Sequence, residues 1–211
     1  MILDLLKGKG RRCIVMCLGI IILGLGVALL KLSLMGNDPC CAMIMGLEGV
    51  TGIAFSKMFI MINAIFFLVE IVFGRKYIGL GTFVNWLFVG VLASFYGELI
   101  TGHFTVPEAF MGRLVFMIAG VLLMSLAVSM YQTADVGIAP YDCLSLLMNE
   151  KFHIPYFWCR MATDAVCTVI AFSVGGIVGL GTLICALGLG PFIQFFDKHI
   201  SEKLCGTAGN E

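Results

Sequence analysis

The segment Ala134-Asp135-Val136-Gly137-Ile138-Ala139-Pro140-Tyr141-Asp142-Cys143 interrupts an otherwise apolar sequence, and the rest of the chain can be interpreted from it. A similar segment, Ser33-Leu34-Met35-Gly36-Asn37-Asp38-Pro39-Cys40-Cys41, lies upstream, with its Gly and its Pro both at an offset of 101. Glycine allows a positive φ, and proline suits the first position of a helix. Each segment therefore predicts the end of one helix and the start of another.

The composition indicates an integral membrane protein. The chain has 211 residues, of which 60% are hydrophobic and 12% charged, and its mean hydropathy is +1.05. A soluble domain of this length carries about 25% charged residues. We therefore expect an all-α chain in contact with a lipid bilayer, without a second, soluble domain. A net charge of zero argues against a nucleic-acid partner.

Cysteine spacing gives no sign of a metal or redox site. Most of the nine cysteines lie inside apolar runs, where cysteine behaves as a small hydrophobic residue. No C-x-x-C pair and no Cys/His spacing typical of a metal site occurs. We expect no cofactor and no metal.

Apolar runs predict six transmembrane helices, and two shorter runs follow the Gly…Pro segments. The long runs cover about 13–35, 53–73, 83–96, 113–133, 155–174 and 183–196, and the short ones 39–48 and 140–149. Ten residues of helix cover about 15 Å, half of the hydrocarbon core. The short helices are therefore predicted to be broken or re-entrant half-helices.

An internal repeat organises these elements. Gly79-Leu80-Gly81-Thr82 recurs as Gly179-Leu180-Gly181-Thr182, so residues 13–97 and 113–197 form two repeats joined by an extracytoplasmic linker, 98–112. Three spans per repeat is an odd number, so the halves must lie in the membrane in opposite senses. This 3+3 inverted-topology repeat is common among secondary transporters, whose sites lie at the repeat interface.

The positive-inside rule orients the chain with both termini in the cytoplasm. The basic N-terminus, 1–12, and the tail, 198–211, then lie on one side. Nine basic residues fall on that side: Lys7, Lys9, Arg11, Arg12, Arg75, Lys76, Lys151, Lys198 and Lys203. Three fall on the other: Lys31, Lys57 and Arg113.

Gly-Ile-Ala-Pro-Tyr-Asp at 137–142 resembles the Gly-x-x-Pro-(Trp/Tyr)-Asp segment of the YczE/YitT-type family of bacterial membrane proteins. Gly-Leu-Gly-Thr at 179–182 is similar to that family's pattern as well, and the resemblance covers about 13–197. It implies a six-helix protein of the bacterial plasma membrane, and it names no substrate. The upstream segment departs from the pattern, because Cys41 stands where Asp142 does.

Arg160 and Asp164 are the sharpest candidates for a functional site. A charge in the middle of a span is costly and is usually functional. Their i, i+4 spacing places both on one helix face, so they form either a substrate or coupling site or an internal ion pair that packs helices. Ile60 and Ala64 stand at the matching places of the first repeat, so the site is asymmetric.

The short helices and three polar residues of the spans supply further candidates. Asp142 and Tyr141, with Gly137 and Pro140, either line a cavity at a helix N-terminus or cap that helix. Asp38 is predicted to be an N-cap that also faces the site. Asn63, Asn85 and Gln132 either bond between helices or line a path. Glu70 is expected to reach toward Arg75.

Together these features predict a secondary transporter of a small polar or organic solute. The site would lie between the repeats and would contain Asp164, Arg160, Asp142, Tyr141, Asn63 and Asp38. No nucleophile–base arrangement occurs, so we do not expect an enzyme. Two alternatives remain open: a membrane accessory or regulatory protein, and a substrate-capture subunit of a larger importer. The partner would then be a membrane protein, and a homo-oligomer is a further alternative.

Overall fold

The computed structural model describes residues 2–104, 106 and 108–206, with side chains from residue 10 onward. All regular elements in this part are helices, as predicted. They are α1 (Ile2–Ser33), α2 (Pro39–Thr51), α3 (Phe55–Phe73), η1 (Arg75–Tyr77), α4 (Leu80–His103), α5 (Phe110–Ala134), α6 (Pro140–Phe152), α7 (Tyr156–Ser173), α8 (Leu180–Phe196), η2 (Asp197–Ser201) and α9 (Glu202–Cys205).

Five helical segments are long and apolar enough to cross a membrane, as expected of a multi-pass membrane protein. They are Gly10–Ser33, Phe55–Phe73, Leu80–His103, Phe110–Ala134 and Leu180–Cys205. Helix α7, which the sequence predicts as the fifth of six spans, is present but is not among them. Its 18 residues include Arg160 and Asp164, and these two charges lower its mean hydropathy.

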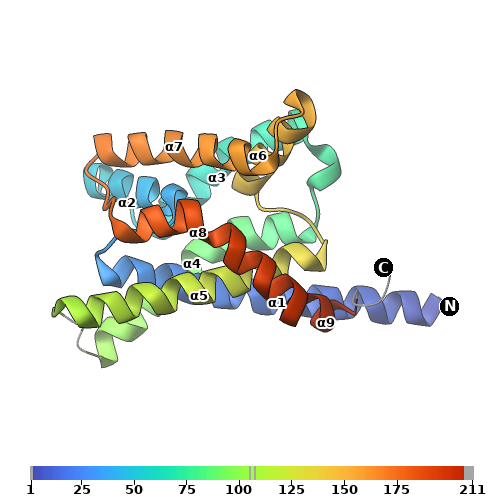
Figure 1. Ribbon diagram of the computed structural model, residues 1–211, viewed down its shortest axis with the longest axis horizontal. Coiled ribbons are helices and arrows are strands. Elements are labelled where there is room, and N and C mark those ends of the chain that lie inside the picture. Colours follow the sequence, from blue (N-terminus) through green and yellow to red (C-terminus); the bar gives the residue numbers. More distant parts are fainter. Residues whose placement is uncertain (1, 105, 107, 207–211) are drawn as a thin grey trace.

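The helices pack in matched pairs. Helices α1 and α5 run side by side, with α4 against α1 and α8 against α5 (Figure 1). On the other side of the molecule, α2 packs against α7 and α3 packs against α6. Each short helix thus contacts a long helix from the other half of the chain.

Several helices are longer than the sequence predicts. Helices α2 and α6 have 13 residues each, about 20 Å, which is still shorter than the hydrocarbon core. Helix α4 continues past Tyr96 to His103, because Gly97 and Gly102 each cost only about 1 kcal/mol in a helix. At the other end of the chain, helix continues beyond Phe196 through a π-helical turn to Cys205.

The two Gly…Pro breaks have the same backbone geometry. Gly36 and Gly137 both have positive φ, +108° and +126°. A Cβ on Gly137 would lie 2.7 Å from the Cα of Gly79, and a Cβ on Gly36 would lie 2.9 Å from the nitrogen of Gly179. Neither position has room for a side chain, because each break packs backbone to backbone against a Gly-Leu-Gly-Thr turn.

Hydrogen bonds join each break to the turn of the other half. The N–H of Gly81 donates to the carbonyl of Val136 at 2.9 Å, and the N–H of Gly181 donates to that of Met35 at 2.8 Å. The Thr82 and Thr182 hydroxyls accept from the N–H groups of Gly79 and Gly179. The repeated motifs therefore interlock the two halves at two equivalent places.

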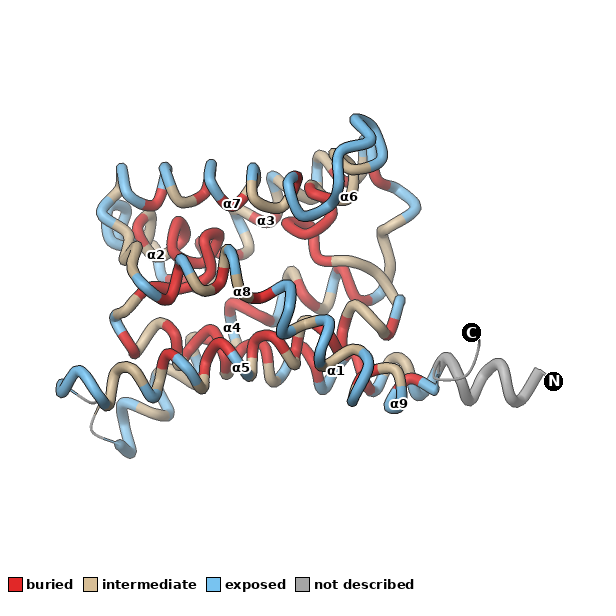
Figure 2. Tube along the Cα trace, viewed as in Figure 1, coloured by how far each residue is buried: buried red, intermediate tan, exposed pale blue. Residues whose placement is uncertain are grey.

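Buried residues follow the inner faces of the helices, and exposed ones follow the outer faces, as Figure 2 shows along α7. The outer faces are rich in large apolar side chains, among them Leu68, Phe88, Val115, Val169 and Leu183. Such a surface is unfavourable in water and suits lipid. The bundle therefore contacts the bilayer with these faces.

Candidate functional site

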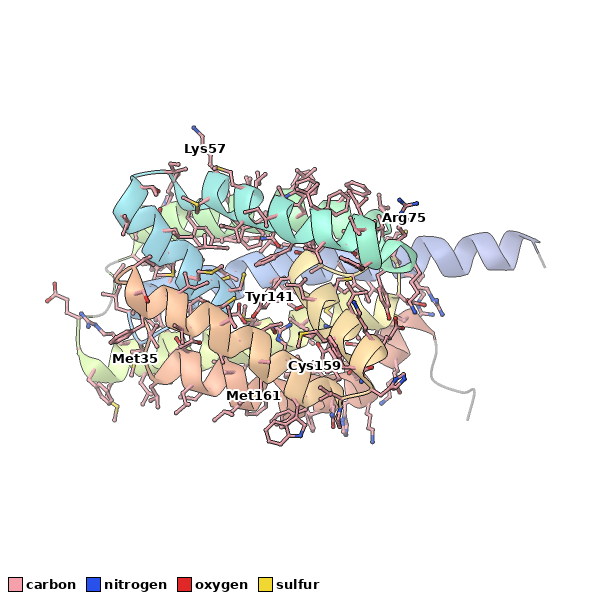
Figure 3. All side chains as sticks on the ribbon, turned by 90° about the horizontal axis from the view of Figure 1, so that it is seen from above. Met35, Lys57, Arg75, Tyr141, Cys159 and Met161 are labelled. Carbon is pink, nitrogen blue, oxygen red and sulfur yellow. The ribbon has the colours of Figure 1, made fainter. Side chains whose placement is uncertain are left out.

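The two short helices begin in the interior. Figure 3 places Tyr141, in the first turn of α6, near the middle of the molecule. At the start of α2, Asp38 is the predicted N-cap and accepts a hydrogen bond from the Cys41 N–H at 3.4 Å. Asn37 holds this break against α1, since its Nδ2 donates to the Val27 carbonyl at 3.2 Å. Both breaks therefore present an acidic side chain inside the bundle.

Arg160 binds three carboxylates that come from three helix segments. Its Nη1 donates to Asp142 of α6, and its Nε lies 3.3 Å from Asp164 of α7, the predicted i, i+4 pair. Its Nη2 lies 3.7 Å from Asp38. All three aspartates are buried, whereas the Arg160 side chain keeps 21% of its surface exposed. The guanidinium thus joins the two short helices to α7.

Tyr141 completes the cluster. Its hydroxyl donates to Asp164 Oδ1 at 2.5 Å, and the Arg160 guanidinium lies 4.8 Å from its ring centroid. A cation above a tyrosine ring is attracted to the π face. Tyr141 therefore holds both partners of the ion pair in place.

A cavity of about 330 Å³ opens beside this cluster. It is lined by side chains from both halves, and six of the predicted site residues contribute: Asp38, Asn63, Tyr141, Asp142, Arg160 and Asp164. Gly137 and Pro140, also predicted, do not line it; they shape the break that positions α6. Asn63 donates to the Phe59 carbonyl of its own helix at 3.0 Å.

The cavity also contains polar residues that the sequence assigned only a general role or did not single out. Asn85 of α4 and Gln132 of α5, named above only as polar residues of the spans, both line it. Asp197 lines it too, and it accepts hydrogen bonds from Ser129 at 2.7 Å and from Thr133 at 2.9 Å. Asp197 directly follows the last predicted span. A charged residue at a span end is expected to lie at the membrane surface, so the sequence did not predict that it lines the cavity.

The prediction for Glu70 is wrong. Arg75 is exposed and its Nε donates to the Ile71 carbonyl at 2.9 Å. Glu70 is fully buried, and its carboxylate lies against the Cys143 thiol. Cys143 is on α6, so Glu70 faces that helix and does not reach outward along the surface of α3.

Comparison with known proteins identifies the family. Residues 10–198 match a family of unknown function, DUF6198. An uncharacterized protein of Haemophilus influenzae is 30% identical over 181 residues, which are 86% of this chain and 81% of that protein. The uncharacterized membrane protein YczE of Bacillus subtilis is 27% identical over 178 residues, 84% of this chain and 81% of YczE.

A third relative covers still more of the chain. The uncharacterized protein YyaS of Bacillus subtilis is 26% identical over 200 residues, 88% of this chain and 94% of YyaS. No solved structure matches. The resemblance to the YczE type is confirmed, and the chain belongs to DUF6198, a family of unknown function.

Proposed function

We propose that the protein is a secondary transporter of a small solute, with its binding site in the cavity beside Arg160. One observation carries this proposal: a buried cluster of ionisable side chains, drawn from both halves of the chain, borders a cavity inside a membrane bundle. Ionisable groups inside a membrane are costly, and they usually face a substrate or ion path. A protein that needed only tight packing would be more stable with an apolar interior here.

An inverted repeat of 3+3 spans is part of the proposal. It is supported by the matched helix pairs α2–α7 and α6–α3, and by the equivalent bonds Gly81 to Val136 and Gly181 to Met35. In this arrangement the N-termini of both half-helices reach the midplane, where solute sites of such transporters lie. Because the two halves interlock at equivalent places, each half can in principle adopt the conformation of the other. Such an exchange would open the site first to one side of the membrane and then to the other, which is alternating access.

The proposal includes α7 as a sixth span. Its start follows Glu150, which accepts a hydrogen bond from Lys76, at the end of the molecule where α3 finishes. The other end of α7, at Ser173, is close to Lys31 and Glu48. Residues 175–177, which follow α7, border the same surface pocket as these two side chains. The ends of α7 are thus at opposite ends of the bundle, as are Lys57 and Arg75 in Figure 3. Charges that are paired inside the bundle explain why this helix is less apolar than the other five.

Uptake into proteoliposomes tests the function. Purified protein is reconstituted with an external mixture of water-soluble metabolites, and the vesicle contents are identified by mass spectrometry. We expect one or a few compounds to accumulate with the wild type and to be absent with Asp164→Asn, which keeps the shape of the side chain. Ser173→Ala, an exposed change at the end of α7, is the matched control.

The contrary outcome is equally clear. If wild-type vesicles contain the same compounds as protein-free vesicles, under both proton and sodium gradients, transport by this chain alone is excluded. The bacterial plasma membrane would remain the expected location, but the accessory role or the importer-subunit role would then replace transport.

A further inference from the structure

We infer that the cavity binds an organic cation, such as a solute with a protonated amine and a small apolar or aromatic body. This inference rests on the proposed function and names the class of solute that the same site would take. It comes from the charge, the aromatic content and one unpaired amide of the cavity wall.

Charge is the first argument. Among the described residues that line the cavity, Arg160 is the one cationic side chain, and four are acidic: Asp38, Asp142, Asp164 and Asp197. With all five ionised the wall has a formal charge of −3. Three of the four carboxyls would have to bind protons before the wall became neutral. A wall with this charge favours a positive guest in a medium of low dielectric constant.

The positive charge of Arg160 is already used. Asp142 and Asp164 hold its Nη1 and Nε, and Asp38 lies near its Nη2. Asp197 is on η2, and among the described residues it accepts hydrogen bonds from the hydroxyls of Ser129 and Thr133, which carry no charge. A cation in the cavity would supply the compensating charge that Asp197 lacks.

An anion, by contrast, finds no free cation in the wall. To reach Arg160 it would have to displace carboxylates that belong to the protein and then lie beside them. Like charges held a few ångströms apart in a low dielectric repel strongly. The wall therefore discriminates against carboxylate and phosphate solutes.

Asn85 is the second, independent observation. It lines the cavity, is only 4% exposed, and its side-chain amide has no hydrogen-bond partner in the described structure. Since Asn85 borders the cavity, its amide is open to a guest that can supply a hydrogen-bond partner. Its carbonyl can accept a hydrogen bond from an ammonium group in the cavity. Asn85 and Asp197 lie on α4 and η2, so they offer acceptors from both halves.

Aromatic rings line the rest of the site. Five of the lining residues are aromatic: Phe59, Tyr131, Tyr141, Tyr156 and Phe157. Faces of such rings attract ammonium groups, and the rings also accept an apolar body. A volume of about 330 Å³ is at the lower end of the range for small-molecule pockets. The site therefore suits a compact amine, not a long chain or a peptide.

Three probes of nearly the same size and shape test the charge preference: benzylamine, which is a cation at neutral pH, benzyl alcohol and benzoate. Thermal unfolding of the detergent-purified protein is followed at equal concentrations of each. A ligand that binds only the native state stabilises it by RT ln(1 + [L]/Kd), so at equal concentration the tighter ligand raises the midpoint more. We expect benzylamine to stabilise the protein and benzoate to leave it unchanged.

Substitutions in the cavity wall test whether benzylamine binds there. Asn85→Ala and Asp197→Asn should each weaken benzylamine binding by about tenfold, the effect of losing one charge or acceptor at a desolvated site. Glu150→Gln removes the same charge from an exposed position outside the cavity and is the control, with benzylamine binding unchanged. A global electrostatic effect would weaken binding in Glu150→Gln as much as in Asp197→Asn.

The outcomes also separate this inference from the proposed function. Stabilisation by benzoate or benzyl alcohol in preference to benzylamine would overturn the cation class and leave transport intact. A lack of response to all three probes would overturn the cation class as well, while transport would still be judged by the uptake of metabolites. Accumulation of only anionic or neutral metabolites in the vesicles would likewise contradict the inference and support the function.

Discussion

The two halves of the chain share the backbone geometry of their Gly…Pro breaks and differ in the charge of the helix that follows each short helix, α3 or α7. Gly36 and Gly137 have similar φ, and each packs on a Gly-Leu-Gly-Thr turn of the other half. Yet α7 carries Arg160 and Asp164, where α3 has Ile60 and Ala64. The repeated geometry therefore forms the scaffold of the bundle, and the charges that are not repeated form the candidate site. Substitutions that act on one or the other should separate these two contributions.

The largest effect is expected from Gly137→Ala, which disturbs the close packing of the second break against the Gly79 turn. The new Cβ would lie within 2.8 Å of three backbone atoms of Gly79, at a φ of +126° that alanine rarely adopts. We expect destabilisation on the order of 4 kcal/mol or more, seen as loss of monodisperse protein in detergent. Gly175→Ala is the control, because Gly175 has positive φ, +72°, but open space around it. Equal losses in the two variants would mean that φ, and not the close approach, sets the requirement.

Arg160→Met removes the cation of the buried cluster and should have the next largest effect. It leaves three buried aspartates without their shared cation, and loss of one partner of a buried pair costs about 3–5 kcal/mol. Ile60→Met at the matching place of α3 should cost less than about 1.5 kcal/mol. Thermal unfolding in detergent gives both values. A similar small loss in both variants would show that the ion cluster contributes little to the fold.

The two breaks should respond differently to the loss of one carboxylate. Asp142 accepts directly from Arg160, whereas Asp38 lies 3.7 Å from it and mainly caps α2. Asp142→Asn should cost about 2 kcal/mol. Asp38→Asn should cost less than about 1 kcal/mol, because asparagine caps a helix as well as aspartate does. The same unfolding assay applies, and a larger loss in Asp38→Asn would reverse the assigned roles.

The smallest effect concerns the surface pair Lys76–Glu150, which joins η1, just after α3, to the end of α6. Hydrogen bonds from Lys76 and Tyr77 lower the pKa of Glu150. A carboxylate with a lowered pKa stabilises the folded state above its unfolded pKa, about 4.3, and the contribution disappears as the pH falls through the folded value. The midpoint difference between wild type and Glu150→Gln should be slight at about pH 6 and absent at about pH 2. A difference that grows in acid would contradict this sign.

Much of the scaffold could be predicted from the sequence. Long apolar runs, repeated Gly-Leu-Gly-Thr turns and Gly…Pro breaks are local signals, and they located the helices, the short segments and the N-cap Asp38. The spacing of Arg160 and Asp164 likewise predicted their ion pair, because i and i+4 share a helix face.

The remainder depends on packing between segments far apart in the chain. That Asp38 and Asp142 meet the same arginine follows from the packing of α2 and α6 around α7, which no local pattern reports. The same holds for Glu70, whose neighbour in sequence, Arg75, is exposed while Glu70 is covered by α6. Helix ends were also missed where glycines did not end a helix, as in α4.

The central claim is that α7 crosses the membrane and carries the site between two inverted halves. Cysteine accessibility tests it most directly, in a variant whose nine native cysteines are replaced. Ser173→Cys marks the C-terminal end of α7, and Lys151→Cys, in the last turn of α6, lies shortly before the start of α7; both positions are exposed. In intact cells an impermeant maleimide should label Ser173→Cys, and it should label Lys151→Cys only after permeabilisation. Labelling of both positions from the same side would contradict the account, because α7 would then not span the bilayer.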